Sequence, residues 1–335
     1  MMYNLKDINS ETLLAGFLRC DVGDIPILRQ RKTGIRRLYI KKKNPKNGYR
    51  VVYEVRDSLL QNCLKCLQTE LSRLYCPPEY ISGFTHGRNI AYNAKFHLNK
   101  KYVLNIDICN FFENIQYTSI VSAFEKLGLN NSFSVILADI VTYYKTLVAG
   151  YNTSPLIDNM VCENMDAEIK ALCDSYNITY TRYADDLSFS GDTVECIDSI
   201  KSILHKYGFN INERKTRIYK KGGPQFVTGL TVVDSQQPRI PRKIKKGLRA
   251  DIYYIKQWGF TSYVEYKYNI ASTDLYLLDY IKHQESCRIM GWLNYINGIE
   301  PVFSKKYITE IESIKKQDLH YFENAYEYVE GKQYG

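Results

Sequence analysis

The chain has 335 residues, of which 45% are hydrophobic and 24% charged, and this balance excludes a disordered or fibrous protein because it supplies enough apolar side chains for a buried core. No stretch approaches the roughly 18 to 20 apolar residues of a membrane span, and the N-terminus lacks the basic-then-apolar order of a signal peptide, so we expect a cytoplasmic protein without membrane contact. The net charge of +9 favours a polyanionic partner.

The first part of the chain predicts a basic hairpin followed by a helix. β-like alternation in RRLYIKKK and YRVVYEV surrounds the turn-forming NPKNG, which predicts a hairpin within residues 28–54. Residues 30–56 contain ten Lys or Arg and one Glu. Apolar residues then recur at helical spacing from Leu59 to Leu74, before two prolines. Cys63 and Cys66 share one face of this helix, and we expect them, like the other scattered cysteines, to be core thiols rather than metal ligands.

The middle of the chain alternates strands and helices. KYVLNIDICNFF predicts a strand that ends in acids and aromatics, and YTSIVSAFEKLGL predicts a helix closed by Gly128. Ser154 is expected to cap a further helix that starts at Pro155. YTRYADDLSFSG then predicts a hairpin with Asp185 and Asp186 at its tip. The predicted buried side of the helix after Pro155 consists of Leu156, Met160, Val161, Met165, Ile169 and Leu172.

The remaining third is predicted to be mainly helical. CIDSIKSILHKYGF is an amphipathic helix, QFVTGLTVV is a candidate pair of short strands, and the prolines of QQPRIPRK mark a boundary near residue 236. Two more basic clusters occupy residues 214–221 and 239–249. Cations interleaved with tyrosines suit a surface that neutralises phosphates and stacks bases, although a charged run is more commonly just a solvated face.

The acids at two strand ends predict a metal site. Adjacent carboxylates repel unless a cation neutralises them, and Asp107 ends a second apolar strand. Three such groups form a hard oxygen site suited to Mg²⁺. Two ions roughly 3.5 to 4 Å apart would activate an attacking hydroxyl and stabilise the leaving oxygen of an in-line phosphoryl transfer. The alternative is that Asp185 and Asp186 are simply turn residues, which tolerate positive φ.

These motifs together resemble a known family. YADD on a hairpin, preceded by NIDICNFF and followed by GFNINERKT, resembles the palm of a reverse transcriptase, with matches from about residue 50 to 229. NAKFH and VTG resemble signatures of the bacterial retron group, and GWLNYING resembles its thumb. The resemblance implies an α+β right-hand polymerase: an N-terminal helix and fingers in residues 1–100, a palm whose antiparallel sheet carries the acids in 101–235, and a helical thumb in 236–335.

The resemblance also implies a function. It implies an RNA-directed DNA polymerase that uses two Mg²⁺ ions and deoxynucleoside triphosphates, and a dedicated structured noncoding RNA that supplies both the template and a 2′-OH primer. The product would be branched RNA–DNA (msDNA), and an effector protein of the same operon would join it in anti-phage defence. One alternative is another bacterial defence or intron-type reverse transcriptase without a branched product; the lack of recognisable maturase or endonuclease domains disfavours the intron type. The other alternative is a catalytically slow RNA-binding scaffold, which the complete set of acids disfavours.

Residue by residue, the resemblance assigns roles in the chemistry. Asp107 and Asp185 match the principal metal ligands, Asp186 matches the second acid of the pair, and Ile108 would offer its backbone carbonyl. Three further matches concern the nucleotide. Phe112 matches the aromatic ring that excludes ribonucleotides, with a core phenylalanine as the alternative, and Lys215 matches the lysine that meets the triphosphate, with a surface lysine as the alternative. Arg88 matches a fingers arginine that clamps triphosphates.

Other matches concern nucleic acid. Asn93 and His97 would face the same way on a helix, where they would either serve RNA binding or local structural support, or form a buried pair with each other. The VTG element resembles one that steadies the primer or product end, where glycine permits close approach of backbone. The basic hairpin at residues 31–46 and the cluster at 239–249 would flank the duplex. The nucleic-acid-binding residues predicted in these last two motifs are Val227, Thr228, Gly229, Arg242, Lys243, Lys245 and Lys246.

The chain departs from the family pattern near the nucleotide. AGYNTSP stands where the family usually has QGAPTSP, so Ala149 replaces a glutamine that approaches the incoming nucleotide, and Asn152 replaces proline. Ala149 and Gly150 are still expected at the nucleotide. The proline and glutamine of the first fingers motif are replaced by Val55 and Cys63. Nucleotide handling, processivity and fidelity are therefore expected to differ from those of relatives.

Overall fold

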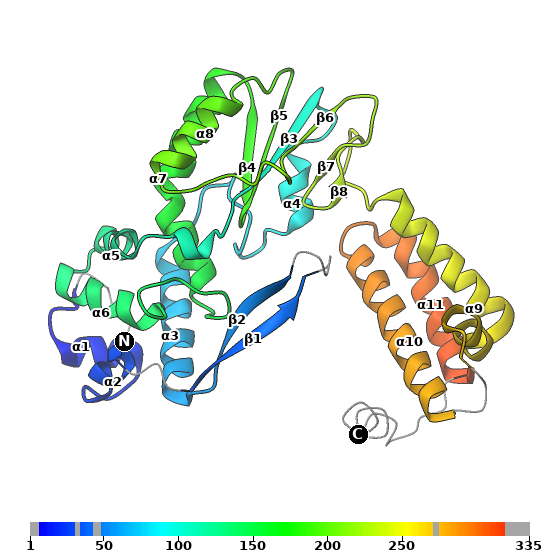
Figure 1. The fold of residues 1–335 in the computed structure, drawn as a ribbon, viewed down its shortest axis with the longest axis horizontal. Helices are drawn as coiled ribbons and strands as arrows, with labels where there is room; N and C mark the ends of the chain where they lie inside the picture. The colour runs from blue at the N-terminus through cyan, green and yellow to red at the C-terminus, as the bar shows by residue number, and fades with distance from the viewer. Residues whose placement is uncertain (1–6, 31–33, 43–47, 271–274, 319–335) are drawn as a thin grey trace. The chain divides into compact units, whose positions relative to one another are not determined.

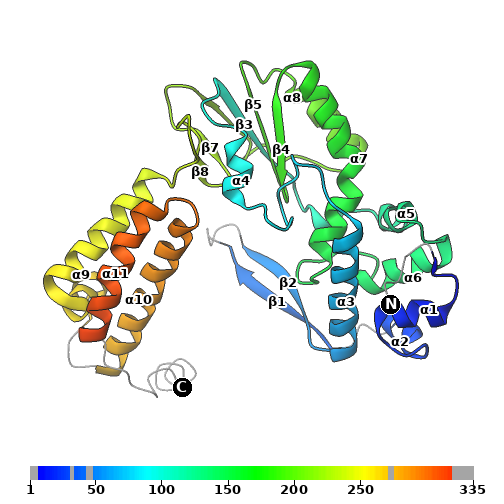
Figure 2. The ribbon, with the colours of Figure 1, turned by 180° about the vertical axis from the view of Figure 1, so that it is seen from behind.

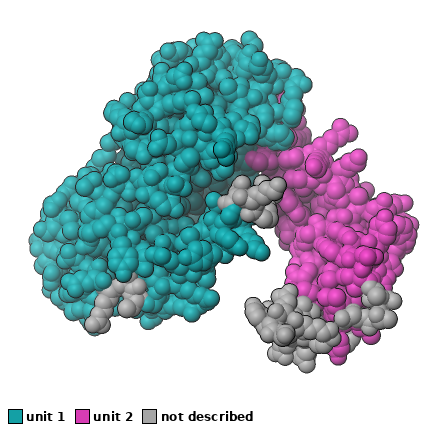
Figure 3. Space-filling view, viewed as in Figure 1, with its two compact units in different colours: residues 1–228 teal, residues 229–335 magenta. Residues whose placement is uncertain are grey.

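The protein divides into two compact units. The computed structural model describes residues 7–30, 34–42, 48–270 and 275–318. The units comprise residues 1–228 and 229–335 (Figure 3). The thumb boundary predicted near residue 236 lies seven residues inside the second unit, so the predicted fingers and the predicted palm up to residue 228 fall together in the first. The three-part division stays a prediction.

A four-stranded antiparallel sheet forms the centre of the first unit. Its strands are β3 (Tyr102–Asp107), β4 (Thr179–Tyr183), β5 (Asp186–Gly191) and β6 (Arg217–Lys220), in the order β4-β5-β3-β6. The predicted acidic hairpin is β4–β5. Both faces of this hairpin are buried. Successive residues of a strand point to opposite faces, and every residue of β5 after Asp186 and the three middle residues of β4 are buried. With the surrounding helices, this sheet confirms the α+β class.

Helices pack beside the sheet. α7 (Ser154–Ser175) contacts β4 and lies alongside α8 (Ile197–Lys206) in both views of the ribbon (Figures 1 and 2). α7 also packs on α5 (Tyr117–Lys126), which contacts α6 (Asn131–Val141). The prediction that Ser154 is the N-cap was wrong by one residue. Thr153 occupies that position, and the Ser154 hydroxyl donates to the carbonyl of Val148 at 2.7 Å instead.

The predicted buried face of α7 is largely confirmed. Leu156, Met160, Met165 and Ile169 are buried, whereas Val161 and Leu172 are only partly covered.

The N-terminal part contains the predicted hairpin and helix. β1 (Ile35–Lys41) pairs antiparallel with β2 (Tyr49–Val55), and α3 (Ser58–Leu74) follows. The ends of the predicted basic hairpin, residues 31–33 and 43–46, lie outside the described residues. Elements whose positions were not predicted include α1 (Glu11–Leu18), α2 (Asp24–Gln30), α6, β6 and the 3₁₀ turn η3 (Phe112–Asn114), whereas α4 (Ile90–Lys95) carries Asn93 as predicted but ends before His97. Cys63 and Cys66 are buried, as predicted. All nine cysteines are free thiols, but Cys76 and Cys287 are exposed, so the prediction of core thiols was wrong for these two.

The second unit is helical. The short strand β7 (Phe226–Val227) ends the first unit, and β8 (Leu230–Thr231) begins the second. Three helices follow: α9 (Arg242–Tyr268), which is interrupted at Gly259 by a φ of 81°, α10 (Leu275–Asn297) and α11 (Pro301–Asp318). α9 and α10 are joined by Glu285, which accepts from Lys267 at 2.8 Å. In the described parts of the chain, no helix combines the length and apolarity needed to cross a bilayer.

Candidate active site

Three carboxylates meet at one end of the central sheet. Asp107 is the last residue of β3, and it lies directly opposite Asp186, the first residue of β5, in the antiparallel register. Asp185 precedes it in the two-residue turn between β4 and β5, where the carbonyl of Asp185 accepts from the amide of Ile108 at 3.0 Å. Ile108 itself is buried. The fold thus brings together all four residues predicted to form the metal site.

The carboxylates repel one another across this end of the sheet. Burial is the main cause that raises the pKa of Asp185, and the charge of Asp107 adds to it. Asp186 keeps an exposed side chain, yet the surrounding protein displaces enough water to raise its pKa to about 6, with repulsion from Asp185 and Asp107 added. The raised pKa values of the two carboxyl groups therefore reflect burial first and the mutual repulsion of the three acids second.

Lys215 supplies the one direct cationic contact that the structure gives this acidic group. Its ammonium donates to Asp107 Oδ1 at 2.7 Å, and this bond is the main cause that raises the pKa of Lys215. The loop that carries Lys215 is fixed by the amide of Asn212, which donates to the Asp107 carbonyl at 2.8 Å. The side chain is 59% exposed, so it remains accessible from solvent.

The donor set fits divalent cations by its chemistry. Among the described residues, no three His, Cys, Asp or Glu side chains already stand in a metal-ligand arrangement. However, three carboxylates converge, two of them carry raised pKa values, and one is partly neutralised by a flexible lysine. Carboxylate oxygens are the ligands that Mg²⁺ takes in phosphoryl-transfer sites, so added positive charge would relieve the repulsion.

A buried arginine supports the acidic turn, and the sequence motifs did not identify it. Arg182 in β4 is fully buried and binds Asp158 and Asp166 of α7. Gly83 lies against the other side of the turn, where an added Cβ would come within 2.2 Å of the Ala184 amide nitrogen. A signal was present in the sequence, because α7 carries Asp158 and Asp166 on a helix whose buried face is otherwise mainly apolar.

The residues predicted to approach the nucleotide occupy two places. Phe112 begins η3, five residues after Asp107, and its half-buried ring packs 5.8 Å from that of Phe111. Ala149 and Gly150 contact the β1–β2 hairpin: the amide of Tyr53 donates to the Ala149 carbonyl at 2.8 Å. At Gly150, where φ is 116°, a Cβ would lie 2.2 Å from the Tyr53 carbonyl oxygen. This glycine permits close approach of β2.

Arg88 is engaged within its own loop. Its Nη1 donates to the carbonyl of Ile81 at 2.7 Å and also to the carbonyl of Pro78, and its guanidinium lies over the Tyr92 ring. In this arrangement the side chain stabilises the loop that precedes α4. The contact of Arg88 with a triphosphate stays a prediction. To make this contact, Arg88 would have to release its hydrogen bonds to the two carbonyl groups.

Asn93 and His97 are both fully buried, but they do not form the pair that was one of the two alternatives. His97 lies beyond the end of α4 and hydrogen-bonds Ser190 and Thr181, each at 2.7 Å. Burial lowers the pKa of His97 to about 3, so the imidazole is neutral. Within the described part of the chain, neither Oδ1 nor Nδ2 of Asn93 has a hydrogen-bond partner. Burial favours a supporting role for both over direct contact with RNA.

The VTG element continues this support. Val227 is buried, and the Thr228 hydroxyl donates to the carbonyl of Ile90 at the start of α4 at 3.1 Å. Gly229 has a φ of 82°, and a Cβ there would meet nothing within 4 Å. The open space at Gly229 is compatible with the predicted approach of another backbone.

The basic residues predicted on the thumb differ from one another. Arg242, Lys243 and Lys246 are exposed at the start of α9. Lys245, by contrast, is mostly covered and donates to Glu300 at 2.8 Å, so it holds α9 to the region between α10 and α11. Three of the four cations are therefore available to a ligand of the second unit.

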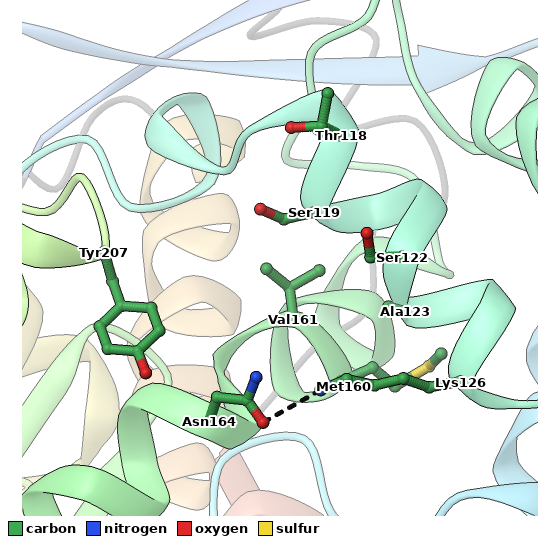
Figure 4. A pocket seen from close by; sticks show the side chains of 9 residues that line it. All are labelled: Thr118, Ser119, Ser122, Ala123, Lys126, Met160, Val161, Asn164 and Tyr207. Carbon is green, nitrogen blue, oxygen red and sulfur yellow. Dashed lines mark hydrogen bonds between the residues drawn. The ribbon is translucent and has the colours of Figure 1, made fainter.

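A separate pocket lies away from these residues. It has a volume of about 190 Å³ and is formed by α5, α7 and Tyr207 (Figure 4). Hydroxyl groups of Thr118, Ser119 and Ser122 line it, and Lys126 donates to Asn164 at 3.0 Å at its edge. None of the predicted site residues lines this pocket.

Comparisons with known proteins agree with the motifs. A family model described as reverse transcriptase (RNA-dependent DNA polymerase) matches residues 40–291. The retron Ec86 reverse transcriptase of Escherichia coli is 28% identical over 322 residues, which cover 95% of this chain and 91% of that protein. The retron Mx65 reverse transcriptase of Myxococcus xanthus is 32% identical over 196 residues, or 50% of this chain and 46% of that one.

Among solved structures, a telomerase from Candida albicans in complex with a TWJ fragment of telomeric RNA is similar with a TM-score of 0.47 and 13% identity. The match covers 91% of this chain and 65% of that one.

Proposed function

The chain belongs to the reverse transcriptase (RNA-dependent DNA polymerase) family and is an RNA-directed DNA polymerase of the retron type; from this premise we propose that it copies a dedicated noncoding RNA into branched RNA–DNA, using Asp107, Asp185 and Asp186 as its catalytic acids. The observation that carries the assignment of these acids is their convergence from two strand ends and one turn, with Asp107 opposite Asp186.

The three carboxylates would hold two Mg²⁺ ions, with the Ile108 carbonyl as a further oxygen. Divalent cations in such a site lower the pKa of an attacking hydroxyl and stabilise the leaving oxygen of a phosphoryl transfer. The residues of the chain orient the reactants. The fixed turn presents Asp185, and Lys215, 2.7 Å from Asp107, is near enough to exchange this contact for an incoming triphosphate or the leaving pyrophosphate.

Substrate selection falls to the residues beside this site. Phe112 would exclude the 2′-hydroxyl of ribonucleotides by steric contact, which requires only a rigid aromatic ring next to the acids. Ala149 and Gly150 would shape the nucleotide site through the β2 backbone, and Arg88 would meet the triphosphate after release from its loop. The exposed cations of the first hairpin and of α9 would neutralise phosphates of the template duplex.

The retron assignment extends to partners. We propose that the RNA provides template and 2′-OH primer, that the product remains attached to the enzyme as msDNA, and that an effector protein of the same operon acts with this complex in anti-phage defence. The homology to retron reverse transcriptases over nearly the whole chain supports this. Nine free thiols fit a reducing compartment, and we place the complex in the cytoplasm.

The metal site is tested by a double substitution. We expect Asp185→Asn with Asp186→Asn to reduce primer extension in Mg²⁺ by at least about 1000-fold, because losing several kcal/mol of charge stabilisation costs about tenfold for each 1.36 kcal/mol. RNA binding should be retained, since the substitutions preserve side-chain shape. Asp198→Asn, a 91% exposed position on α8, is the matched control. Normal extension by the double variant would contradict the assignment.

The retron type is tested by the nucleic acid that co-purifies with the protein. Sequencing should return one RNA joined to DNA, and treatment with a debranching enzyme should separate them. DNA without a 2′–5′ branch would instead support another bacterial or intron-type reverse transcriptase. Tight RNA binding without any DNA product would support the scaffold alternative.

A further inference from the structure

Arg182 is a fully buried charged side chain two residues before the Ala184–Asp185 turn. A buried guanidinium is tolerated only when its charge is compensated and its donors are used. Arg182 meets both conditions through α7. Its Nε and Nη2 donate to Asp166 at 2.8 to 3.1 Å, its Nη1 donates to Asp158 at 2.9 Å, and its Nη2 also donates to Asn159 at 3.0 Å.

One further bond connects this buried cluster to the acidic turn. Nη1 of Arg182 also donates to the carbonyl of Ala184 at 3.2 Å. Ala184 has a φ of 57°, a left-handed conformation that is unfavourable for a residue with a Cβ and that persists only where the surroundings enforce it. The turn is therefore held in its conformation by a contact from Arg182 of β4, whose guanidinium is itself held by Asp158 and Asp166 of α7.

A second set of contacts connects the same helix to the turn. Asn159 donates through Nδ2 to the carbonyl of Gly83 at 2.9 Å, and the amide of Ser82 donates to the Arg182 carbonyl at 2.9 Å. Gly83 in turn lies directly against the Ala184 amide. α7 thus reaches the turn by two routes, through the Arg182 guanidinium to the Ala184 carbonyl and through the backbone of Gly83 to the Ala184 amide.

We propose that Arg182 is a positioning residue of the polymerase reaction, which transmits the fixed position of α7 to the turn that carries Asp185 and Asp186. A planar guanidinium with five donors serves three α7 side chains and the Ala184 carbonyl at once, and an ammonium with three donors does not. The inference rests on the proposed catalytic role of Asp185 and Asp186.

The test compares two conservative variants within one buried network. Arg182→Lys retains the positive charge beside Asp158 and Asp166 but loses the planar fork. Tyr180→Phe, the matched control, removes a hydroxyl that donates to Asp166 at 2.7 Å in the same strand and leaves the contact with Ala184 intact. The measurements are kcat and KM for deoxynucleotides, melting temperature, and hydrogen–deuterium exchange of peptides that span the turn.

We expect Arg182→Lys to lower kcat about 100-fold with little change in KM, because a displacement of about 1 Å in a reacting group costs that much. Exchange should rise at the turn but not in α7. Tyr180→Phe should lower the melting temperature and leave kcat within about threefold of the original protein, since removing a structural bond does not change transition-state stabilisation. Equal effects of both variants on kcat, or faster exchange throughout the sheet, would overturn the proposal.

Two further variants keep the outcomes distinct. If Arg182→Lys does not fold, Asn159→Ala is the second variant, because it keeps the ion cluster but removes one acceptor of Arg182 and the hydrogen bond to Gly83. This variant should lower kcat and raise hydrogen–deuterium exchange locally at the turn. An unchanged kcat would overturn the proposal. Activity in Asp185→Asn would refute the catalytic assignment itself. An inactive Asp185→Asn beside a fully active Arg182→Lys would refute only the positioning role.

Discussion

Gly83 allows a sharp test of how the acidic turn is placed. A Cβ built at this position would lie 2.2 Å from the Ala184 amide nitrogen and about 3 Å from two backbone atoms of Tyr183. Since non-bonded carbon contacts are optimal at about 3.5 to 4.0 Å, Gly83→Ala forces the turn away by roughly 1 Å. Overpacking of this kind costs about 1 to 3 kcal/mol of stability. We expect a rate of primer extension about 100-fold lower, because the displacement is transferred to Asp185.

The assay is single-turnover extension of a primed RNA template, with the fraction of active enzyme determined by titration so that lost stability is not mistaken for lost rate. Gly23→Ala is the matched control, because an added Cβ there meets nothing within 4 Å. It should extend the primer at the original rate. Equal rates for the two variants would refute the argument that the segment at Gly83 sets the position of the acids.

Two other predictions concern the nucleotide and pH. Phe112→Ala should raise the ratio of ribonucleotide to deoxynucleotide incorporation at least about tenfold, as expected for a lost steric contact; an unchanged ratio would remove the gate role. Burial lowers the pKa of His97 to about 3, whereas the ordinary pKa of about 6.5 applies in the unfolded chain, so the unfolded chain binds the proton first as pH falls. The free energy of unfolding is therefore highest above pH 6.5 and decreases as pH falls toward 3, by about 2 kcal/mol at pH 5. Urea unfolding at pH 7 and pH 5 should show this loss in the original protein and not in His97→Gln; equal losses would contradict it.

The acidic end of the sheet was predictable because its signals are local. An apolar strand that ends in Asp107, and a short break before Asp186 between two alternating runs, define both elements and the placement of their acids. The α3 helix and the first hairpin follow from the same kind of periodicity. The sequence also predicted the free thiols, because scattered cysteines in apolar patterns are typical of a core.

The supporting residues were not predictable because their partners lie far away in sequence. Arg182 looked like one member of an alternating strand, and only the packing of α7 on β4 shows that it is fully buried with Asp158 and Asp166. His97 and Asn93 were assigned to one helical face, but α4 ends at Lys95, and His97 binds strand hydroxyls instead. Local periodicity can mark the acids on the buried face of α7, but it does not identify Arg182 as their partner.

The basic strand β6 has a consequence for the behaviour of the protein in solution. It is an outer strand of the central sheet, and exposed outer strands offer unpaired backbone groups to other chains. Arg217 and Lys220 are exposed at its two ends, and β6 is only four residues long. Short, cationic outer strands resist edge-to-edge pairing, because a second copy would bring like charges together. We therefore expect the cations of residues 214–221 to disfavour pairing through this edge whether or not they also bind nucleic acid, and we expect their replacement to leave the exposed Ile218 unprotected and to favour aggregation.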